Sequence, residues 1–578
     1  MAEHARAAWN KALSVIQVSG GGIANETMFY TELYHFLIEP AAFNDVNGQY
    51  IGFDNKIHTV LAGHTQYANI TTWDGYRSFI GLLALLEPGE ASDVITSMLN
   101  DAAQGGPGLP RWEQANSNSA GMVGDDPDPY IATAYAFGAH GFDTSAALHA
   151  VDLGGSVPTT TSGGQLVRAN DQQWMSGHYV PGTASVSLEY GVDDFSIAAF
   201  ANALGNTALY NKYMPRAQNW EYTFNPATNF AEPKDSAGAF PANFSPTSDT
   251  GMTEGDSYQY TPMVPFNLAG LTAAFGGSAA YTRYLEQLYA NPSVANSGPN
   301  GTGAYVGNEP SEEIPWELDY TGAPEQAQGA IRSVITNDYT PTPGGLPGND
   351  DGGALSSWYV WAAIGMYPET PGVGTLALGS PLFPHTEITL GNGKVLTLNA
   401  NGNTDSTPYI HSMTVNGVSW SRAYLPLSAI NGGGTIGYSL SSTPDNSWAS
   451  GPHAAPPSFT SNETPAIGYT TPTSQATIRP GGTANLNVAA RNITGSAQVV
   501  SWTASPASGV SLSSGAGSFQ VPASSDGQQQ VQVRAGSTPG TYPVTFHLTT
   551  ADGTALPNVV LNVVVSRSTA AHTTPGQR

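Results

Sequence analysis

Five clusters of acidic and aromatic residues hold the side chains of this 578-residue sequence that are best suited to chemistry on a sugar. Trp and Tyr rings stack on the apolar faces of sugars, while Asp, Glu, Asn and Arg form fixed hydrogen bonds with hydroxyl groups. The clusters are TTWDGYRS (71–78), PRWEQ (110–114) with GDDPD (124–128), TEGDSYQY (253–260), VGNEPSEEIPWELDY (306–320) and GLPGNDDGGALSSWY (345–359). Their shared composition predicts a carbohydrate-binding pocket.

Cleavage of a glycosidic bond needs two carboxyl groups, one protonated to assist the leaving oxygen and one ionised to act on water or on carbon. We take Glu254 and Asp351 as candidates for this pair. Glu254 precedes a predicted helix, with Met252 nearby and Tyr258 one turn on. Apolar enclosure by these neighbours would favour the protonated form that an acid requires. The alternative on this pattern alone is a first-turn glutamate that stabilises the start of a helix.

The second candidate lies in a glycine-flanked turn. Asp350 and Asp351 occur in GNDDGG, directly before a predicted helix over residues 354–366. An aspartate at such a place also serves commonly as the N-cap of the helix or as a turn residue. The catalytic and the capping interpretations of this turn therefore both stay open at this point.

A compact loop rich in oxygen ligands suggests a metal site. Asn308, Glu309, Glu312 and Glu313 follow one another closely, and calcium prefers carboxylate and amide oxygens. The spacing is not that of an EF-hand, and paired glutamates are often only solvated charges, so both interpretations stay open. The twelve histidines show no HExxH or paired spacing, and no GxSxG motif or phosphate-binding glycine loop occurs.

Composition excludes several classes of function. Lys and Arg number 18 against 44 Asp and Glu, a net charge of −26, which argues against binding to nucleic acid or to an anionic membrane. Cysteine is absent, so disulfides, Cys-ligated zinc and a thiol nucleophile are excluded. No run of about 20 apolar residues predicts a membrane span, and the N-terminal MAEHARAAWNKALSVIQ does not have the pattern of a signal peptide.

The elements that must position these clusters are helices in the first part of the chain. Apolar residues recur at three- and four-residue spacing from about Glu3 to Pro368, as in 25–38, where a proline at position 40 follows the stripe. About a dozen such segments predict an (α/α)6 toroid over 25–368. Short alternating segments over 369–449 predict a small β layer that packs on it.

The remainder of the chain predicts a separate unit. Pro- and Ser-rich residues 450–473 form a predicted linker, and regularly spaced strand patterns over 474–566 predict an immunoglobulin-like β-sandwich. We expect residues 567–578 to be a disordered tail. The predicted fold class is therefore a multidomain α plus β protein.

Taken together and in order, the motifs resemble glycoside hydrolase family 92, the α-mannosidases. The resemblance runs from about residue 8 to residue 448. The segments that carry it are LYHFLIEP, GHTQYANITTWDGYRSFIGLLALLEP, LPRWEQANSNSAGMVGDD, VSLEYGVDDFSIAAFANALG, MTEGDSYQYTPMVPFN, GNEPSEEIPWELDYTGAPEQAQ and GLPGNDDGGALSSWYVWAAIGMYP. It implies a calcium-dependent enzyme that removes terminal mannose with inversion, built from a β-sandwich and an (α/α)6 barrel.

The resemblance implies roles for individual residues. The general acid falls on Glu254 and the catalytic base on Asp351, while Asn349 stands where many relatives carry an acidic residue. Calcium would be held around Asn308 and Glu309, with Asp351 near or in its shell. For an inverting pair, we expect the carboxyls of Glu254 and Asp351 to lie roughly 6.5–9.5 Å apart.

The resemblance also implies a substrate-binding set. In TTWDGYRS, an Arg–Asp pair would fix sugar hydroxyls and Trp would pack on a sugar face. The expected set is Trp73, Asp74, Arg77, Trp112, Glu189 and Tyr260. The expected substrate is terminal α-linked mannose, with α-1,2 linkage, in N-glycans or mannans.

One departure from the family pattern concerns the start of the chain. The long N-terminal β-sandwich of the family is missing, and residues 1–24 resemble the connector helix that leads from it into the barrel. That sandwich would be the natural intramolecular partner of a larger, secreted enzyme. The alternatives are an inactive carbohydrate-binding fragment and another (α/α)6 glycosidase of the glucoamylase type.

Overall fold

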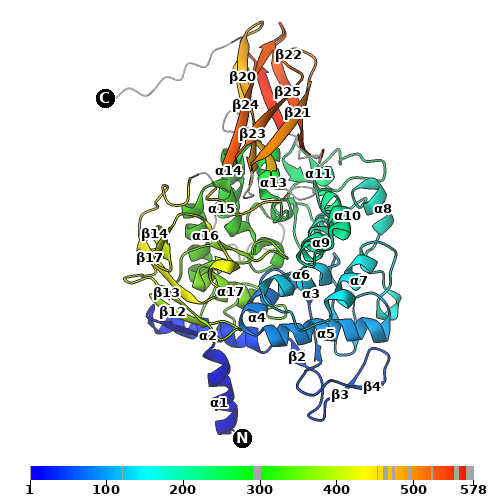
Figure 1. Cartoon of the computed structure of the whole chain (residues 1–578), viewed down its shortest axis with the longest axis vertical. Coiled ribbons are helices and arrows are strands. Elements are labelled where there is room, and N and C mark those ends of the chain that lie inside the picture. Colours follow the sequence, from blue (N-terminus) through cyan, green and yellow to red (C-terminus); the bar gives the residue numbers. More distant parts are fainter. Residues whose placement is uncertain are drawn as a thin grey trace. The chain divides into compact units, whose positions relative to one another are not determined.

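The computed structural model describes residues 2–119, 121–225, 227–290, 301–451, 453–459, 466–470, 475–492, 497–522, 525–551, 553 and 559–567 (Figure 1). The chain divides into two compact units. The first contains Met1–Phe266 and Tyr284–Pro456, and the second contains Asn267–Arg283 and Pro457–Arg578. All five of the sequence clusters lie in the first unit, which therefore holds the candidate site.

Helices build most of the first unit. Four of them, α4 (Phe79–Leu86), α6 (Pro127–Phe137), α9 (Ala184–Ala203) and α17 (Ala354–Ile364), are buried along nearly their whole length. They contact one another in the order α17, α4, α6, α9. A helix that is apolar on every side must lie inside the fold, and FIGLLALL of α4 is the clearest case. These four helices form the inner layer.

Less completely buried helices pack against the inner layer. Contacts join α2 to α17, α5 to α4, α7 and α10 to α9, and α16 to α17. Their bounds are α2 Gly22–Leu37, α5 Pro88–Gly105, α7 Thr144–Gly154, α10 Thr207–Ala217 and α16 Pro324–Asn337. The other helices are α1 Ala2–Leu13, α3 Thr72–Gly75, α8 Asp171–Gly177, α11 Trp220–Thr223, α12 Ser257–Tyr260, α14 Ser278–Leu288 and α15 Leu318–Thr321. Among the described residues, no helix combines the length and the hydropathy needed to cross a membrane.

The first unit also contains a six-stranded sheet in the order β1-β12-β13-β17-β14-β15. Its strands are Ile16–Ser19, His385–Thr389, Val395–Asn399, Gly434–Ser441, Tyr409–Val415 and Val418–Trp420. A three-stranded sheet joins β10 (Met366–Tyr367), β11 (Thr375–Leu378) and β16 (Tyr424–Pro426). Strand β1 comes from residues 1–24, which we predicted as a connector helix. Within that segment α1 ends at Leu13 and α2 begins at Gly22, and β1 between them pairs antiparallel with β12.

The second unit consists mainly of two sheets, in the orders β18-β20-β24-β22 and β19-β26-β25-β21-β23. Side chains from both sheets share one apolar core, including Leu486 and Val533 from the first and Trp502, Phe546 and Leu561 from the second. The strands are β18 Ala466–Thr470, β19 Gln475–Ile478, β20 Thr483–Asn492, β21 Gln498–Pro506, β22 Val510–Leu512, β23 Ala516–Val521, β24 Ser525–Ala535, β25 Gly540–Thr550 and β26 Val559–Val565. Helix α13 (Leu268–Ala274) belongs to the same unit.

Two predicted segments fall partly outside the described residues. Strand β18 lies within the predicted linker 450–473, and residues 452, 460–465 and 471–473 of that segment are not among those described. Of the predicted tail, the structure describes residue 567 alone.

The first unit contains a buried pair of acidic side chains. Asp101 on α5 is 4% exposed and Glu113 is 1% exposed. Burial raises the pKa of Asp101 to about 8, and burial together with repulsion from Asp101 raises the pKa of Glu113. Gln66 Nε2 donates to both carboxylate oxygens of Asp101 at 3.3 Å. An asparagine at position 101 would keep a carbonyl oxygen that can accept a hydrogen bond from Gln66.

We expect Asp101→Asn to stabilise the protein at pH 8. Folding raises the pKa of the Asp101 carboxyl, so ionisation of this carboxyl lowers the free energy of unfolding. The folded protein keeps its full stability below pH 4 and loses part of it as the pH rises toward 8. The variant should raise the Tm at pH 8 by about 2–4 °C and leave it nearly unchanged at pH 4. Melting curves at both values test this, with exposed Asp249→Asn as the charge-matched control. Equal shifts at pH 4 and pH 8 would contradict it.

Candidate functional site

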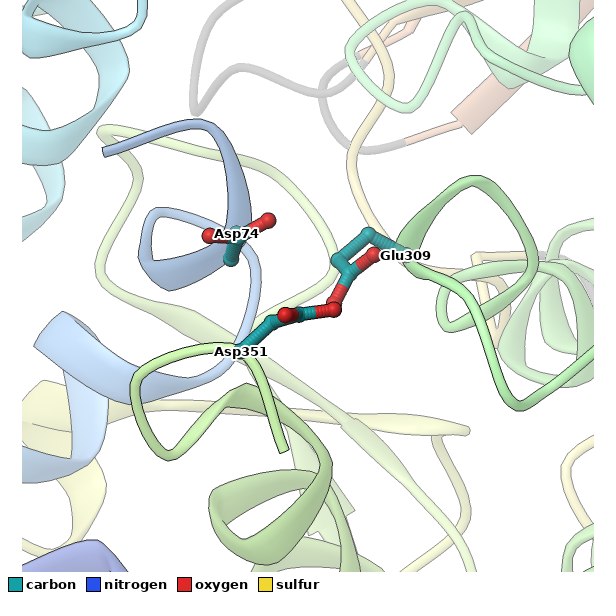
Figure 2. A group of neighbouring side chains, drawn as sticks. All are labelled: Asp74, Glu309 and Asp351. Carbon is teal, nitrogen blue, oxygen red and sulfur yellow. The ribbon is translucent and has the colours of Figure 1, made fainter. Parts of the chain in front are cut away.

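Three carboxylates from distant parts of the sequence meet at one point in the first unit (Figure 2). Asp74 comes from α3, Glu309 from the 3-10 turn Glu309–Ser311, and Asp351 from the turn before α17. One oxygen of each lies within 4.8 Å of the others, and Figure 2 shows the side chains of Glu309 and Asp351 reaching toward each other. Asp74 and Glu309 are buried and Asp351 is half-buried. We call these three residues the carboxylate cluster.

The cluster is electrostatically unfavourable without a cation. Burial, followed by repulsion from Asp351, raises the pKa of Asp74, and burial followed by repulsion from Asp74 raises the pKa of Glu309. Neither carboxylate oxygen of Glu309 has a hydrogen-bond partner among the described residues. Buried, unpaired carboxylate oxygens are the donors that calcium prefers, so the donor set fits the ion that the sequence predicted.

The predicted acid and base interact electrostatically. Burial is the main cause that raises the pKa of Asp351 to about 6, and repulsion from Glu254 is the next. Glu254 also repels Asp74. The side-chain Nδ2 of Asn308 donates to the Glu254 carbonyl oxygen at 2.9 Å, so the loop that carries Glu309 also contacts the backbone of Glu254.

The expected apolar enclosure of Glu254 is wrong for this chain. The Glu254 side chain is exposed, whereas Tyr258 packs against Phe230 and stacks on Tyr284. Tyr258 therefore packs against these two rings and leaves the Glu254 carboxyl exposed.

The structure also weakens both ordinary interpretations of the two acids. The N-cap of α12 is Asp256, in a capping box with Gln259, so the helix-start role does not belong to Glu254. Before α17 the N-cap is Gly353, and it is Asp350 whose Oδ1 accepts the Ser356 backbone N–H at 2.9 Å, so Asp351 does not cap the helix. Both candidate carboxyls are free of these structural tasks.

Backbone conformation distinguishes the same two residues. Glu254 has φ of 52° and Asp351 has φ of 44°, in the left-handed region that side chains with a Cβ rarely adopt. Such a conformation costs about 1–2 kcal/mol per residue. Strained residues of this kind are concentrated in active sites and ligand-binding sites, where surrounding structure holds them.

Three residues of the predicted substrate-binding set form a buried network instead of a platform open to a sugar. Trp73 Nε1 donates to Glu189 Oε1 at 2.8 Å, and Arg77 pairs with Glu189 at 3.1 Å and with Glu313 at 3.3 Å. Trp73 and Glu189 are fully buried and Arg77 is 1% exposed. The network anchors α3 to α9, and α3 carries Asp74. These residues therefore help to fix the position of Asp74 in the carboxylate cluster.

The other predicted residues lie around the site in different ways. Tyr260 is buried and its hydroxyl donates to the Thr253 carbonyl at 2.7 Å, next to Glu254. Trp112 is partly exposed and forms a backbone bridge with Thr71, whose hydroxyl donates to the Asp351 carbonyl at 3.4 Å. Asn349 is exposed, two positions before Asp351. Of this set, Trp112 is the aromatic residue that remains open to a sugar.

Sequence reasoning missed one member of the carboxylate cluster. Asp74 was expected to bind substrate, and the predicted metal ligands were Asn308, Glu309 and Asp351. No spacing in the sequence relates Asp74 to Glu309, because the fold alone brings α3 to the loop after residue 305. The only available signal was the position of Asp74 in a cluster that already pointed to sugar binding.

Comparison with known proteins identifies the family of the chain. The family profile described as the glycosyl hydrolase family 92 catalytic domain matches residues 1–442. A family GH92 α-mannosidase from Bacteroides thetaiotaomicron is 27% identical with a TM-score of 0.73, over 78% of this chain and 60% of that one. A family GH92 inverting mannosidase from the same species, strain VPI-5482, is 27% identical with a TM-score of 0.73, over 79% and 64%.

A curated relative from Arthroderma benhamiae is described as an uncharacterized secreted glycosidase. It is 24% identical over 501 residues, which cover 79% of this chain and 58% of the relative. The chain thus spans about three fifths of the length of the relatives that it matches.

Proposed function

The chain belongs to glycosyl hydrolase family 92, and we propose that it is a glycosidase that releases terminal α-linked mannose from glycans. The observation that carries this proposal is the pair of strained acids, Glu254 and Asp351, that repel each other, with Asp351 also a member of the carboxylate cluster. The two solved mannosidases, one of them named as inverting, support mannose as the substrate.

In the proposed reaction the two acids have opposite tasks. Glu254 donates a proton to the glycosidic oxygen as the bond to the anomeric carbon breaks, and Asp351 takes a proton from the water that attacks that carbon. Exposure leaves Glu254 accessible to the leaving group. Partial burial gives Asp351 a pKa of about 6, so it is mostly ionised at neutral pH, as a base must be.

The carboxylate cluster supports a metal-assisted form of this reaction. Asp74 and Glu309 would hold a calcium ion with Asp351 beside it, and Asn308 is adjacent in sequence to Glu309. When bound, the ion would supply positive charge that orients neighbouring sugar hydroxyls. Asn308 also fixes the backbone of Glu254, so one loop positions both the ligand Glu309 and the acid.

The finer parts of the proposal concern the wider protein. We infer that the inner and outer helices close into the (α/α)6 toroid, that the two sheets of the second unit form an immunoglobulin-like sandwich, and that an N-terminal β-sandwich segment covers the exposed Glu254. We also infer secretion, because the curated relative is described as secreted.

A comparison of substrates tests the function. Purified protein should hydrolyse aryl α-mannoside and leave aryl α-glucoside intact, and NMR should detect β-mannose as the first product, as inversion requires. Mannobioses of defined linkage then test the α-1,2 preference. Hydrolysis of the glucoside would favour a glucoamylase-type enzyme, and binding of mannose without hydrolysis would favour an inactive carbohydrate-binding chain.

A further inference from the structure

We propose that Glu32, Ser356 and Asp350 form a hydrogen-bonded chain, the positioning chain, that holds the turn carrying Asp351 in its reactive conformation. Asp350 and Asp351 are neighbours in the turn, while Glu32 lies on α2, far away in the sequence. The inference rests on the proposed function, because it assigns a role relative to the proposed base. None of its three members touches the substrate in this role, so they are positioning residues.

The turn needs external support. Asp351, Gly352 and Gly353 have φ values of 44°, 69° and 89°, three left-handed residues in succession. A Cβ at position 352 would overlap the Thr71 hydroxyl, and one at position 353 would lie 3.1 Å from the Phe79 ring. The backbone of this turn is therefore closely packed on one side, and Asp351 stays strained only while its neighbours fix it.

The positioning chain supplies that support through two hydrogen bonds in series. Asp350 Oδ1 accepts the Ser356 backbone N–H at 2.9 Å, and Ser356 Oγ donates to Glu32 Oε2 at 2.7 Å. Ser356 is fully buried and Glu32 is 2% exposed. The chain thus links the first turn of α17 to α2 on one side of Asp351, and the Thr71 hydroxyl binds the Asp351 carbonyl on the other.

The place of Glu32 on its helix argues for a special role. The buried face of α2 is otherwise apolar, with Met28, Phe29, Leu33 and Phe36. A carboxylate on such a face opposes folding unless hydrogen bonds compensate for its lost hydration. A leucine would suit the packing better, so Glu32 is best explained by the bond that it accepts from Ser356 and by His35, 3.5 Å away.

A merely structural bond between α2 and α17 would predict a different outcome from a positioning role. Asp351 acts on water whatever the leaving group, whereas help from Glu254 matters most for poor leaving groups. A shift of the base turn should therefore lower kcat equally for aryl α-mannosides with good and poor leaving groups. A general loosening of the site would weaken substrate binding as well and would raise KM.

The experiment compares Ser356→Ala with Ser357→Ala in the full chain. Ser357 is equally buried on the same helix, but its hydroxyl bonds Ser78 and the Ala354 carbonyl and not the positioning chain. We expect S356A to lower kcat roughly tenfold for both leaving groups with KM unchanged. S357A should stay within about twofold of the parent, and S356T, which keeps the hydroxyl, within about threefold.

Glu32→Leu provides a second, independent variant that suits the apolar face and keeps the test valid if S356A fails to fold. E32L should also lower kcat roughly tenfold, and the double variant should lose no more than either single one, because both break one chain. Equal kcat in S356A and S357A, or a hundredfold loss in the double variant, would overturn the positioning chain while leaving the proposed function intact. Absence of mannosidase activity in the parent would instead overturn the proposed function, and this role with it.

Discussion

Glu254→Gln should lower kcat by about a thousandfold on α-mannosides with poor leaving groups, since general acid catalysis contributes roughly 10²–10⁴-fold. Glutamine keeps the size of the side chain but has no proton to give to the leaving oxygen. On 2,4-dinitrophenyl α-mannoside, whose leaving group departs without protonation, the same variant should lose less than about tenfold. Steady-state kinetics on both substrates measure this difference.

The matched control is Glu286→Gln, which changes an exposed glutamate on α14 in the same way. It should keep parental kcat on both substrates. Equal losses of E254Q on good and poor leaving groups would show that Glu254 supports the fold of its loop and does not act as the acid. An E254Q variant as active as the parent would remove Glu254 from the reaction altogether.

The helical part of the fold was predictable where apolar residues dictate it. The apolar run in 354–366 predicted a helix, and α17 covers 354–364 because Gly365 adopts a left-handed φ of 76° and ends it. The predicted helix that follows Glu254 is two short helices, α12 and α13, and two prolines in TPMVPFN separate them. Periodicity locates helices, and proline and glycine decide where they end.

Other features depend on contacts that no local pattern encodes. Strand β1 follows a helical stripe in the sequence and forms only because β12, far along the chain, offers an edge. The buried network of Arg77 with Glu189 and Glu313 joins three distant motifs. The sequence identified these residues as polar and suited to sugars, but their full burial follows from tertiary packing.

Some features of the site could be predicted from the sequence, and others could not. The resemblance to family 92 is confirmed by the family profile over residues 1–442. It placed Glu254 and Asp351 in one site, and the structure brings their charges into interaction. Asp74 joined the carboxylate cluster unexpectedly, and Asp350, not Asp351, accepts the Ser356 backbone N–H at the start of α17. The order of the motifs predicts which residues come together in the site. The role of each residue, such as metal ligand or helix-start acceptor, depends on its contacts in the fold.

Calcium removal should have the second largest effect. Treatment with EDTA should lower activity more than a hundredfold and added calcium should restore it, because the cluster then holds mutually repelling carboxylates and no cation to orient the sugar. A second readout is independent of activity. Calcium that binds the folded state alone must raise the Tm in proportion to the logarithm of its concentration, once the dissociation constant is exceeded.

Paired variants of one loop then identify the ligand. Glu309→Gln should weaken calcium binding at least tenfold and shift the Tm response to higher calcium, because it removes one of the three carboxylates. Glu312→Gln is the comparison in the same loop: Glu312 is 1% exposed, lies outside the carboxylate cluster and repels Glu309, so this variant should change the response to calcium less than Glu309→Gln does. A parent whose Tm and activity ignore both EDTA and calcium would exclude the metal. The three carboxylates would then have to share protons, which predicts that Glu309→Gln stabilises the apo protein.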